Sequence, residues 1–307
     1  MRALVITCMY PSAQNPASGS FVRDQVAALR RMPDLEVEVF AFQPGRMSAY
    51  VRAARDVRRR YRGVRFDVIH AHFGLTMWPA LGLSGIPHAV TLHGTDLVHP
   101  RSRLITVAGL PFMDLVAPVS AELARLIPRK AVRGEIAVLP CGVETRRFKR
   151  IDRVQARQAL GLDEAGPFLL FPANPARPEK RYDRARAVAG DVRLLILKDV
   201  DPCEVPLWIN AANAVLVPSE RESFGLAVLE ALACDVPVVA TPVGNAPDVL
   251  DGIEGTYCGP FDVGTWRAAV APLVAHADPR VEGRSAAGLH SADRMADRVR
   301  AAWATLS

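Results

Sequence analysis

Two glutamates, Glu222 and Glu230, stand eight positions apart in the stretch "SERESFGLAVLEALACDVPVVATPVG" (219–244), most of which is apolar. Carboxylates persist beside a protein core only when they are paired, hydrogen-bonded or in contact with a ligand. Ser223 and Gly225 are typical of a helix start, and apolar residues then recur at helical spacing: Leu226, Leu229 and Ala233. This pattern predicts that Glu230 lies about two turns into a helix, at the edge of its buried stripe. A lone glutamate there is more often structural, and the second carboxylate weakens that interpretation.

These glutamates must be held by an alternation of strands and helices. Short runs rich in β-branched residues alternate with helix-like segments, which is typical of a parallel, doubly wound sheet. The runs of the first half are 3–7, 37–42, 67–72, 89–93, 115–120 and 136–140, and those of the second half are 168–172, 192–197, 214–218, 236–241 and 256–258. The restart in the second half predicts two such sheets, and 307 residues are enough for two α/β domains.

The predicted domain boundaries follow from local composition. Residues 142–166 are charged, helix-prone and poor in β-branched residues. We therefore predict one Rossmann-like domain over 1–148, a linker over 149–166 and a second Rossmann-like domain over 167–289. The remaining segment, 290–307, predicts a closing C-terminal helix, because three apolar residues at helical spacing follow a serine that favours the N-cap: Met295, Val299 and Trp303.

Composition narrows the class of protein. Half of the residues are hydrophobic and 23% are charged, which is typical of a globular rather than a disordered chain. Lysine and arginine outnumber aspartate and glutamate by 38 to 32, a balance compatible with nucleic acid, anionic lipid or a phosphorylated ligand. Five scattered cysteines without a C-x-x-C pair predict neither a disulfide framework nor a zinc site, so a reducing cytoplasm is expected. The first residues lack a signal-peptide core, and no apolar run is long enough to span a bilayer.

The glutamate pair resembles the motif of the family-4 glycosyltransferases, which have the GT-B fold, two Rossmann-like domains facing a cleft. That motif is two glutamates separated by seven residues and followed by a small-residue run, which here reads "ACDVPVVATPVG" and ends at Gly244. The resemblance implies that Glu222 lies at the donor sugar and Glu230 at the ribose of the nucleotide. It also implies that backbone amides at the helix start contact the donor diphosphate, namely those of Phe224, Gly225 and Leu226.

The resemblance extends into the first half of the chain, which it makes the acceptor side. The loop in "YPSAQNPASGSFVRDQVAALR" is similar to the family's first strand-to-helix loop, where Gly19 would let backbone amides approach a phosphate or the acceptor. Taken alone, a glycine there is more often part of a plain turn. His93 follows a strand in "HAVTLHGTD", at the strand end where doubly wound sheets bind ligands. A lone histidine is more often structural, but the match implies that His93 lines the donor-sugar pocket.

The second half departs from the family pattern at two places. After the strand 168–172, "FPANPARPEKRYD" puts Lys180 where the family has the lysine that grips the diphosphate. Pro175 occupies the position of the family's arginine, so Arg177 is the nearest substitute, and a solvated basic turn is the alternative. Beyond 194–197, the chain lacks the strand and helix that often line the nucleobase pocket in the family, which leaves the base open.

The resemblance implies a retaining, metal-independent transferase that moves a hexosyl unit from a UDP- or GDP-linked sugar. The acceptor would be a hydroxyl of a glycan, a lipid-linked molecule or a small molecule, and no resident cofactor is expected. Lys180 and Arg177 would neutralise the leaving diphosphate, while Glu222 and His93 would orient the sugar.

Three alternatives stay open. "DVD" (199–201) resembles the metal-binding triplet of the other glycosyltransferase fold. Two Rossmann-like sheets also occur in NAD(P)-dependent oxidoreductases, although no G-x-G-x-x-G follows the first strand. In the third alternative, the chain binds nucleotide sugars without turning them over.

A basic segment, 47–66, predicts an amphipathic helix. Its apolar stripe is Met47, Tyr50, Val51, Ala54, Val57 and Tyr61, and its arginines lie mostly elsewhere, at 52, 55, 58, 59, 60 and 62. Such a helix can lie on anionic lipid, although an ordinary helix packed on a sheet shows the same pattern. We therefore hypothesise a cytoplasmic protein that contacts the inner face of the membrane peripherally and acts on a polysaccharide or lipid-linked acceptor. Sparse aromatic residues and the lack of a reading module argue against nucleic acid.

Overall fold

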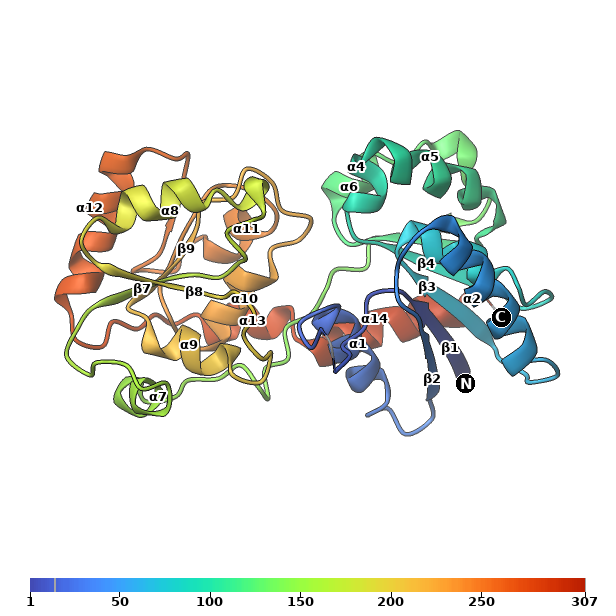
Figure 1. Ribbon diagram of the computed structural model, residues 1–307, viewed down its shortest axis with the longest axis horizontal. Helices are drawn as coiled ribbons and strands as arrows, with labels where there is room; N and C mark the ends of the chain where they lie inside the picture. Colours follow the sequence, from blue (N-terminus) through green and yellow to red (C-terminus); the bar gives the residue numbers. More distant parts are fainter. Residues whose placement is uncertain (14, 307) are drawn as a thin grey trace. The chain divides into compact units, whose positions relative to one another are not determined.

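The computed structural model describes residues 1–13 and 15–306. Gln14, in the loop before Gly19, and Ser307, at the end of the predicted closing helix, lie outside the described residues. The chain forms two compact units, each built on its own parallel sheet (Figure 1). The N-terminal unit is Met1–Gly142 with Ala292–Ser307, and the C-terminal unit is Val143–Ser291.

The N-terminal unit has a six-stranded parallel sheet in the order β2-β1-β3-β4-β5-β6. Its strands are β1 Arg2–Thr7, β2 Glu36–Ala41, β3 Val68–His72, β4 His88–Leu92, β5 Leu115–Pro118 and β6 Glu135–Ile136. Its α-helices are α1 Ser20–Leu29, α2 Met47–Arg60, α3 Met77–Ala80, α4 Thr95–Val98, α5 Pro100–Gly109, α6 Ala121–Arg125 and α14 Ala292–Ala304. Strands β3, β4 and β5 are buried at every residue, as expected for parallel strands covered on both faces.

The C-terminal unit has a five-stranded parallel sheet in the order β11-β10-β9-β7-β8. Its strands are β7 Phe168–Phe171, β8 Arg193–Ile196, β9 Ala214–Val217, β10 Val238–Ala240 and β11 Tyr257–Cys258. Its α-helices are α7 Arg153–Ala159, α8 Tyr182–Ala189, α9 Val205–Ala211, α10 Leu226–Ala233, α11 Ala246–Leu250, α12 Val263–Ala275 and α13 Arg284–Leu289. Only α9 connects β8 to β9, in agreement with the short connection seen in the sequence.

Both sheets place the first strand between the second and the third. The direction of winding therefore reverses between β1 and β3 in one unit and between β7 and β9 in the other. Doubly wound sheets bind their ligands beyond the carboxyl ends of the strands at such a switch point. The sheets thus indicate where the functional residues of each unit should be sought.

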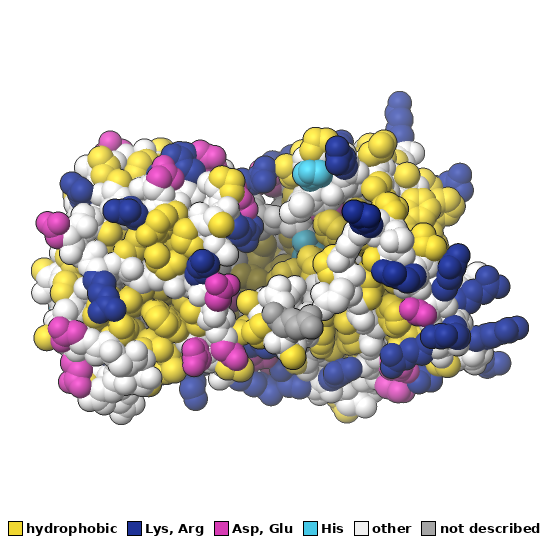
Figure 2. All heavy atoms as spheres, in the orientation of Figure 1, with side chains coloured by type: hydrophobic (Ala, Val, Ile, Leu, Met, Phe, Trp, Pro, Cys, Tyr) yellow, Lys and Arg dark blue, Asp and Glu magenta, His cyan; other side chains and the backbone are white. Residues whose placement is uncertain are grey.

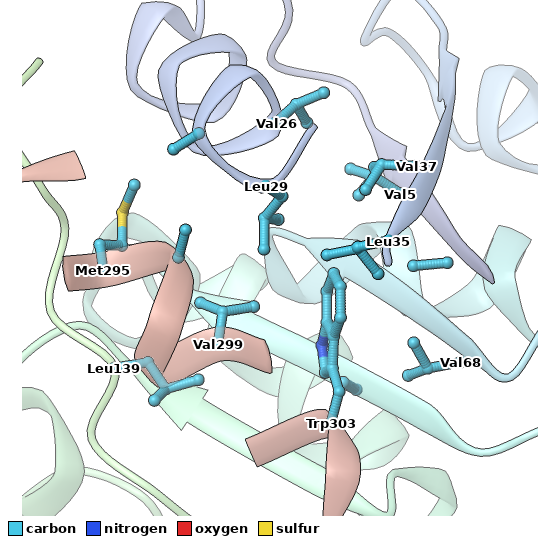
Figure 3. Packing of buried hydrophobic residues seen from close by; sticks show 14 of the residues in the cluster. Val5, Val26, Leu29, Leu35, Val37, Val68, Leu139, Met295, Val299 and Trp303 are labelled. Carbon is cyan, nitrogen blue, oxygen red and sulfur yellow. The ribbon is translucent and has the colours of Figure 1, made fainter. Parts of the chain in front are cut away.

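The last helix, α14, completes the core of the N-terminal unit. Met295, Val299 and Trp303 are each at most 3% exposed and project from α14 toward α1 and the sheet (Figure 3). They pack with Leu29 of α1 and Val68 of β3 in one hydrophobic cluster. The end of the chain is therefore part of the same packed unit as its beginning.

The segment 149–166, predicted as a linker, instead contains helix α7 within the C-terminal unit. Arg153 and Arg157 on α7 are buried, and their guanidinium groups donate to the carbonyl oxygens of Asn210 and Ala211 at 3.2 and 3.0 Å. Burial lowers the pKa of Arg153 to about 9. From composition alone, these arginines would be expected to face solvent. In the structure they donate hydrogen bonds to buried carbonyl oxygens. The units accordingly divide after residues 142 and 291 rather than after 148 and 289.

The predicted two-sheet α/β architecture is confirmed, since every predicted strand run overlaps a strand of the structure. Parallel strands covered on both faces read as short apolar runs, which is why the pattern is visible in the sequence. None of the described helices combines the length and the apolar character needed to cross a bilayer.

Candidate functional site

The C-terminal unit brings Lys180 and Glu222 together at its switch point. Lys180 ends the short helix η4 (Pro178–Lys180) after β7, and Glu222 lies in the loop after β9. The ammonium nitrogen of Lys180 lies 2.7 Å from each carboxylate oxygen of Glu222, and the two side chains are only 15% and 10% exposed. Ser219 Oγ donates to Glu222 Oε1, also at 2.7 Å. Because β7 and β9 are neighbours, residues 42 positions apart meet at one edge of the sheet.

The loop after β10 crosses closely over the loop that carries Glu222. Gly244 has a φ of 63°, and a Cβ there would lie 2.6 Å from the carbonyl oxygen of Phe224 and 2.8 Å from Glu222 Cβ. The next residue, Asn245, donates its backbone N–H to the same Phe224 oxygen at 2.7 Å. Only glycine allows this approach at such a φ. The close packing of the two loops is therefore enough to explain why residue 244 is glycine.

Helix α10 begins beside these loops. Gly225 is its N-cap, with a φ of 104°, Phe224 is buried, and Leu226 is the first helical residue. The first N–H groups of a helix have no intrahelical partner and carry partial positive charge, which favours an anion. Glu230 is half-buried on α10, one turn past Leu226 rather than two turns into a helix that starts at Ser223.

Arg177 does not join the pair of Lys180 and Glu222, because it forms an ion pair with Glu179 instead. It is the N-cap of η4, and its guanidinium donates to Glu179 Oε1 at 2.9 and 2.7 Å. More than half of its side chain, 58%, is exposed. The structure therefore joins Lys180 to Glu222 but leaves Arg177 on the surface with Glu179.

The N-terminal unit carries a stack of three histidines at its own switch point. His70 and His72 lie on one face of β3, and His93 follows β4. Ring centroids are 4.8 Å apart between His70 and His72 and 5.4 Å apart between His72 and His93, with interplanar angles of 21° and 20°. The side-chain nitrogen of Gln25 lies 3.3 Å from His72 Nε2, and His72 Nδ1 lies 3.1 Å from His93 Nε2. An amide nitrogen only donates, so His72 donates from Nδ1 and His93 keeps its proton on Nδ1.

The other end of the stack is anchored in the core. Trp303 Nε1 donates to His70 Nδ1 at 3.1 Å, and His70 Nε2 lies 2.7 Å from Thr91 Oγ1. Burial lowers the pKa of His72 to about 3. Burial, with neighbouring histidines, also holds the pKa values of His70 and His93 well below the usual range. The half-buried His93 therefore offers a neutral N–H rather than a positive charge.

Asp96 shapes the turn that presents His93. Its carboxylate is fully buried and accepts the backbone N–H groups of His93 at 2.9 Å, Gly94 at 2.7 Å and Gly74 at 3.3 Å. Burial raises the pKa of Asp96, although these backbone bonds act in the opposite direction. The side chain thus fixes the backbone on which the imidazole is carried.

Gly19 lies where the first strand's loop meets α1. It is the N-cap of α1 with a φ of 65°, and a Cβ there would lie 2.1 Å from the carbonyl oxygen of Met9. A backbone contact therefore requires glycine here, as in a tight turn. A cavity of about 310 Å³ lies beside this loop, and its lining includes Tyr10, Ser12, Asn15, Ser18 and Gln43.

Several residues of these groups escape sequence reasoning. Spacing along the chain does not indicate the contacts of Ser219, Gln25 and Asn245, and only the fold forms them. The H-x-H spacing of His70 and His72 was a usable signal, since alternate residues of a strand lie on one face.

The aspartates of the "DVD" triplet lie in the loop before α9. Asp201 Oδ1 accepts the backbone N–H of Cys203 at 2.8 Å, and Asp199 has a φ of 57°. Within residues 1–13 and 15–306, no three His, Cys, Asp or Glu side chains are grouped in a way that could hold a metal ion. All five cysteines are free.

Comparison with known proteins places both units. The Glycosyltransferase Family 4 model matches residues 13–147, and the Glycosyl transferases group 1 model matches residues 153–276. The chain is 30% identical over 338 residues to a D-inositol 3-phosphate glycosyltransferase of Mycolicibacterium paratuberculosis, which covers 92% of this chain and 74% of the relative. Sucrose-phosphate synthase of Thermosynechococcus elongatus has a similar structure, with a TM-score of 0.77 at 17% identity over 100% of this chain and 99% of that one. Anabaena HepE, solved with UDP and glucose, has a TM-score of 0.72 at 16% identity over 99% and 100%.

The two structural likenesses extend over nearly all of each chain, and they show that the fold is GT-B. The family models match the two halves of the sequence in succession, and the sequence relationship covers most of both proteins. The expectations of a GT-B fold and of a glycosyltransferase are confirmed. The chain is a glycosyltransferase and belongs to the family-4 glycosyltransferases.

Proposed function

We propose that this glycosyltransferase moves a hexosyl unit, with retention of configuration, from a UDP- or GDP-linked sugar to a hydroxyl of a glycan, lipid-linked or small-molecule acceptor. The observation that carries the proposal is the Lys180–Glu222 pair at the switch point, close to the start of α10. An ammonium group and a helix N-terminus favour a diphosphate. A carboxylate beside them can accept hydrogen bonds from sugar hydroxyls.

In the proposed reaction, the bond between the anomeric carbon and the diphosphate oxygen breaks, and its electron pair leaves with the diphosphate. The acceptor oxygen bonds to the anomeric carbon on the same face of the sugar, and its proton passes to the departing diphosphate. Lys180 and the backbone amides of Phe224, Gly225 and Leu226 neutralise the charge that builds up on the leaving group. Arg177 turns from Glu179 toward the same diphosphate.

The remaining roles concern orientation. Glu222 holds hydroxyls of the donor sugar, and Glu230 holds the ribose hydroxyls of the nucleotide. His93 donates its neutral Nδ1–H to the sugar, so it orients the donor without adding a charge that competes with Lys180. The cavity beside Gly19 is the proposed acceptor pocket, since its lining includes hydroxyl and amide groups suited to a polyol.

The relatives suggest which molecules to test first. HepE was solved with UDP and with UDP-glucose, and the M. paratuberculosis relative is a D-inositol 3-phosphate glycosyltransferase. UDP-glucose and D-inositol 3-phosphate are therefore a reasonable first donor and acceptor. GDP-mannose is the second donor to test. The short connection from β8 to β9 does not indicate whether the nucleobase is uracil or guanine.

The test is to incubate the chain with a donor labelled with carbon-13 at the anomeric position and to follow the product by NMR. Transfer from an α-linked donor should give an α-linked product. A β-linked product would contradict retention. Binding of the donor with no transfer to any acceptor and no hydrolysis would favour a nucleotide-sugar-binding protein, and binding of NAD(P) alone would favour an oxidoreductase.

A further inference from the structure

The Asn245 side chain is buried without a hydrogen-bond partner. The residue is 6% exposed, and within the part of the chain that the structure describes neither Oδ1 nor Nδ2 has a partner. Asn245 is the N-cap of α11, but its side chain makes no capping bond. Pro247 at the second helical position has no N–H to offer, and Asp248 and Val249 donate to the backbone oxygen of Asn245 instead. Native proteins rarely leave such an amide unpaired, so its position needs a reason.

The unpaired amide lies at the start of α10. Its Oδ1 is 2.6 Å from the position that a Cβ on Gly225, the N-cap of α10, would occupy. The preceding residue, Gly244, lies against Glu222, the partner of Lys180. The side chain therefore lies beside the start of an eight-residue helix, and the residue before it contacts one member of the charged pair.

We propose that the Asn245 amide is a ligand-binding group that donates from Nδ2 to a phosphate oxygen of the donor, beside the first N–H groups of α10. This inference rests on the proposed function, because it requires a nucleoside diphosphate at that helix start. A phosphate oxygen accepts from several donors at once, and it can satisfy Nδ2 together with the helix amides. In the ligand-free chain both polar atoms are shielded from solvent, so a phosphate cannot reach Nδ2 unless the side chain moves. In this proposal, the amide turns toward the first turn of α10 when the phosphate binds.

If Asn245 serves the ligand, its removal should weaken nucleotide binding without lowering the stability of the fold. A partnered buried asparagine supports the fold, so its removal destabilises the chain. Asn213 is such a residue, because its Oδ1 accepts from Arg157 and Phe168 and its Nδ2 donates to the oxygens of Leu273 and His276. Asn245 has no such bonds to lose in the ligand-free chain. Asn213→Ala is therefore a matched control for Asn245→Ala.

The experiment measures the thermal midpoint of the ligand-free variants and their affinity for UDP, GDP and ADP by calorimetric titration. Asn245→Ala should unfold at the wild-type temperature or above. It should bind the nucleotide that the wild type binds at least roughly tenfold more weakly, as expected for a lost hydrogen bond to a charged group. Asn245→Ser, which keeps one donor, should lose less affinity. Asn213→Ala should unfold earlier with its affinity unchanged.

Two results would overturn the inference while leaving the proposed function intact. One is an unchanged affinity in Asn245→Ala, and the other is a thermal midpoint that falls as far as in Asn213→Ala. A wild-type chain that binds none of the three nucleotides would instead refute the proposed function, and the inference with it.

Discussion

At the residue scale, Lys180 is the group on which the proposed chemistry depends most. Its ammonium is the charge paired with Glu222 at the switch point, and a positive group placed at a leaving diphosphate acts mainly in the transition state. We predict that Lys180→Ala lowers kcat by roughly 100- to 1,000-fold. Lys149→Ala, which removes an exposed lysine from the same unit, is the control and should keep the wild-type rate. Equal rates for the two variants in a nucleotide-release assay would contradict the assigned role.

Arg177 should behave differently, because it is exposed and its pairing lies within one short turn. An exposed ion pair contributes little to stability, so Arg177→Ala should leave the thermal midpoint unchanged. If the guanidinium turns to the diphosphate, the KM for the donor should rise about tenfold, the cost of one charge-assisted hydrogen bond. A donor KM equal to that of the wild type would show that the basic turn is only solvated.

The histidine stack links stability to pH. The pKa of His72 is about 3 in the folded chain, against about 6.5 in an unfolded one. Between these values, the unfolded chain binds a proton that the folded chain does not, so the free energy of unfolding falls as the pH falls. We predict that His72 alone accounts for a loss of about 2 kcal/mol between pH 7 and pH 5. Chemical denaturation at the two pH values measures it.

The variants for this prediction are His72→Gln and His99→Gln. The first should reduce the dependence of the unfolding free energy on pH, because glutamine does not titrate. The second replaces an exposed histidine outside the stack and is the control for removing one histidine. An unfolding free energy that is the same at pH 5 and pH 7 would argue against a neutral stack.

At the element scale, α2 divides its residues between core and solvent. Tyr50 and Val57 are buried, as the predicted stripe requires, but Met47 and Val51 are 54% and 49% exposed. The arginines at 52, 55, 58, 59, 60 and 62 are exposed, and dark blue side chains gather over this part of the N-terminal unit (Figure 2). Exposed apolar residues beside a basic face suit an anionic lipid surface.

We predict that the chain co-sediments with vesicles of phosphatidylcholine and phosphatidylglycerol, and not with phosphatidylcholine alone. Replacing the arginines at 52, 55 and 58 by glutamine should weaken binding at least tenfold, because each adds about 1 kcal/mol near an anionic surface. The control replaces three exposed arginines of the C-terminal unit, at 150, 186 and 193. The same loss in both variants, or in neither, would refute the role of α2.

The elements also show what a sequence can predict. Fully buried parallel strands are visible as apolar runs, so the sheets and the glutamate-bearing helix are predicted well. Helix α7 is misread as a linker because composition does not reveal that Arg153 and Arg157 bond to buried carbonyls. The pairing of Lys180 with Glu222 and the placement of Asn245 against Gly225 depend on strand order and loop crossing, which spacing along the chain does not encode.

At the scale of the whole molecule, the two units share one sheet topology. Each winds a parallel sheet outward from a switch point, and each places polar side chains at the carboxyl ends of the strands there. The N-terminal unit offers neutral donors, led by His93, while the C-terminal unit offers a charged pair. This division agrees with hydrogen bonding to hydroxyl groups in the N-terminal unit and with binding of a diphosphate in the C-terminal unit.

The central claim is that the C-terminal unit binds a nucleoside diphosphate through Lys180 and Glu230. The most direct measurement is the shift of the thermal midpoint with UDP, GDP, ADP and TDP, for the wild type and for Lys180→Ala and Glu230→Ala. We predict that one diphosphate stabilises the wild type, since a ligand that binds only the folded state raises the midpoint, and that both variants lose most of this shift. The claim would be contradicted if no diphosphate stabilised the wild type, or if the variants shifted as much as the wild type does.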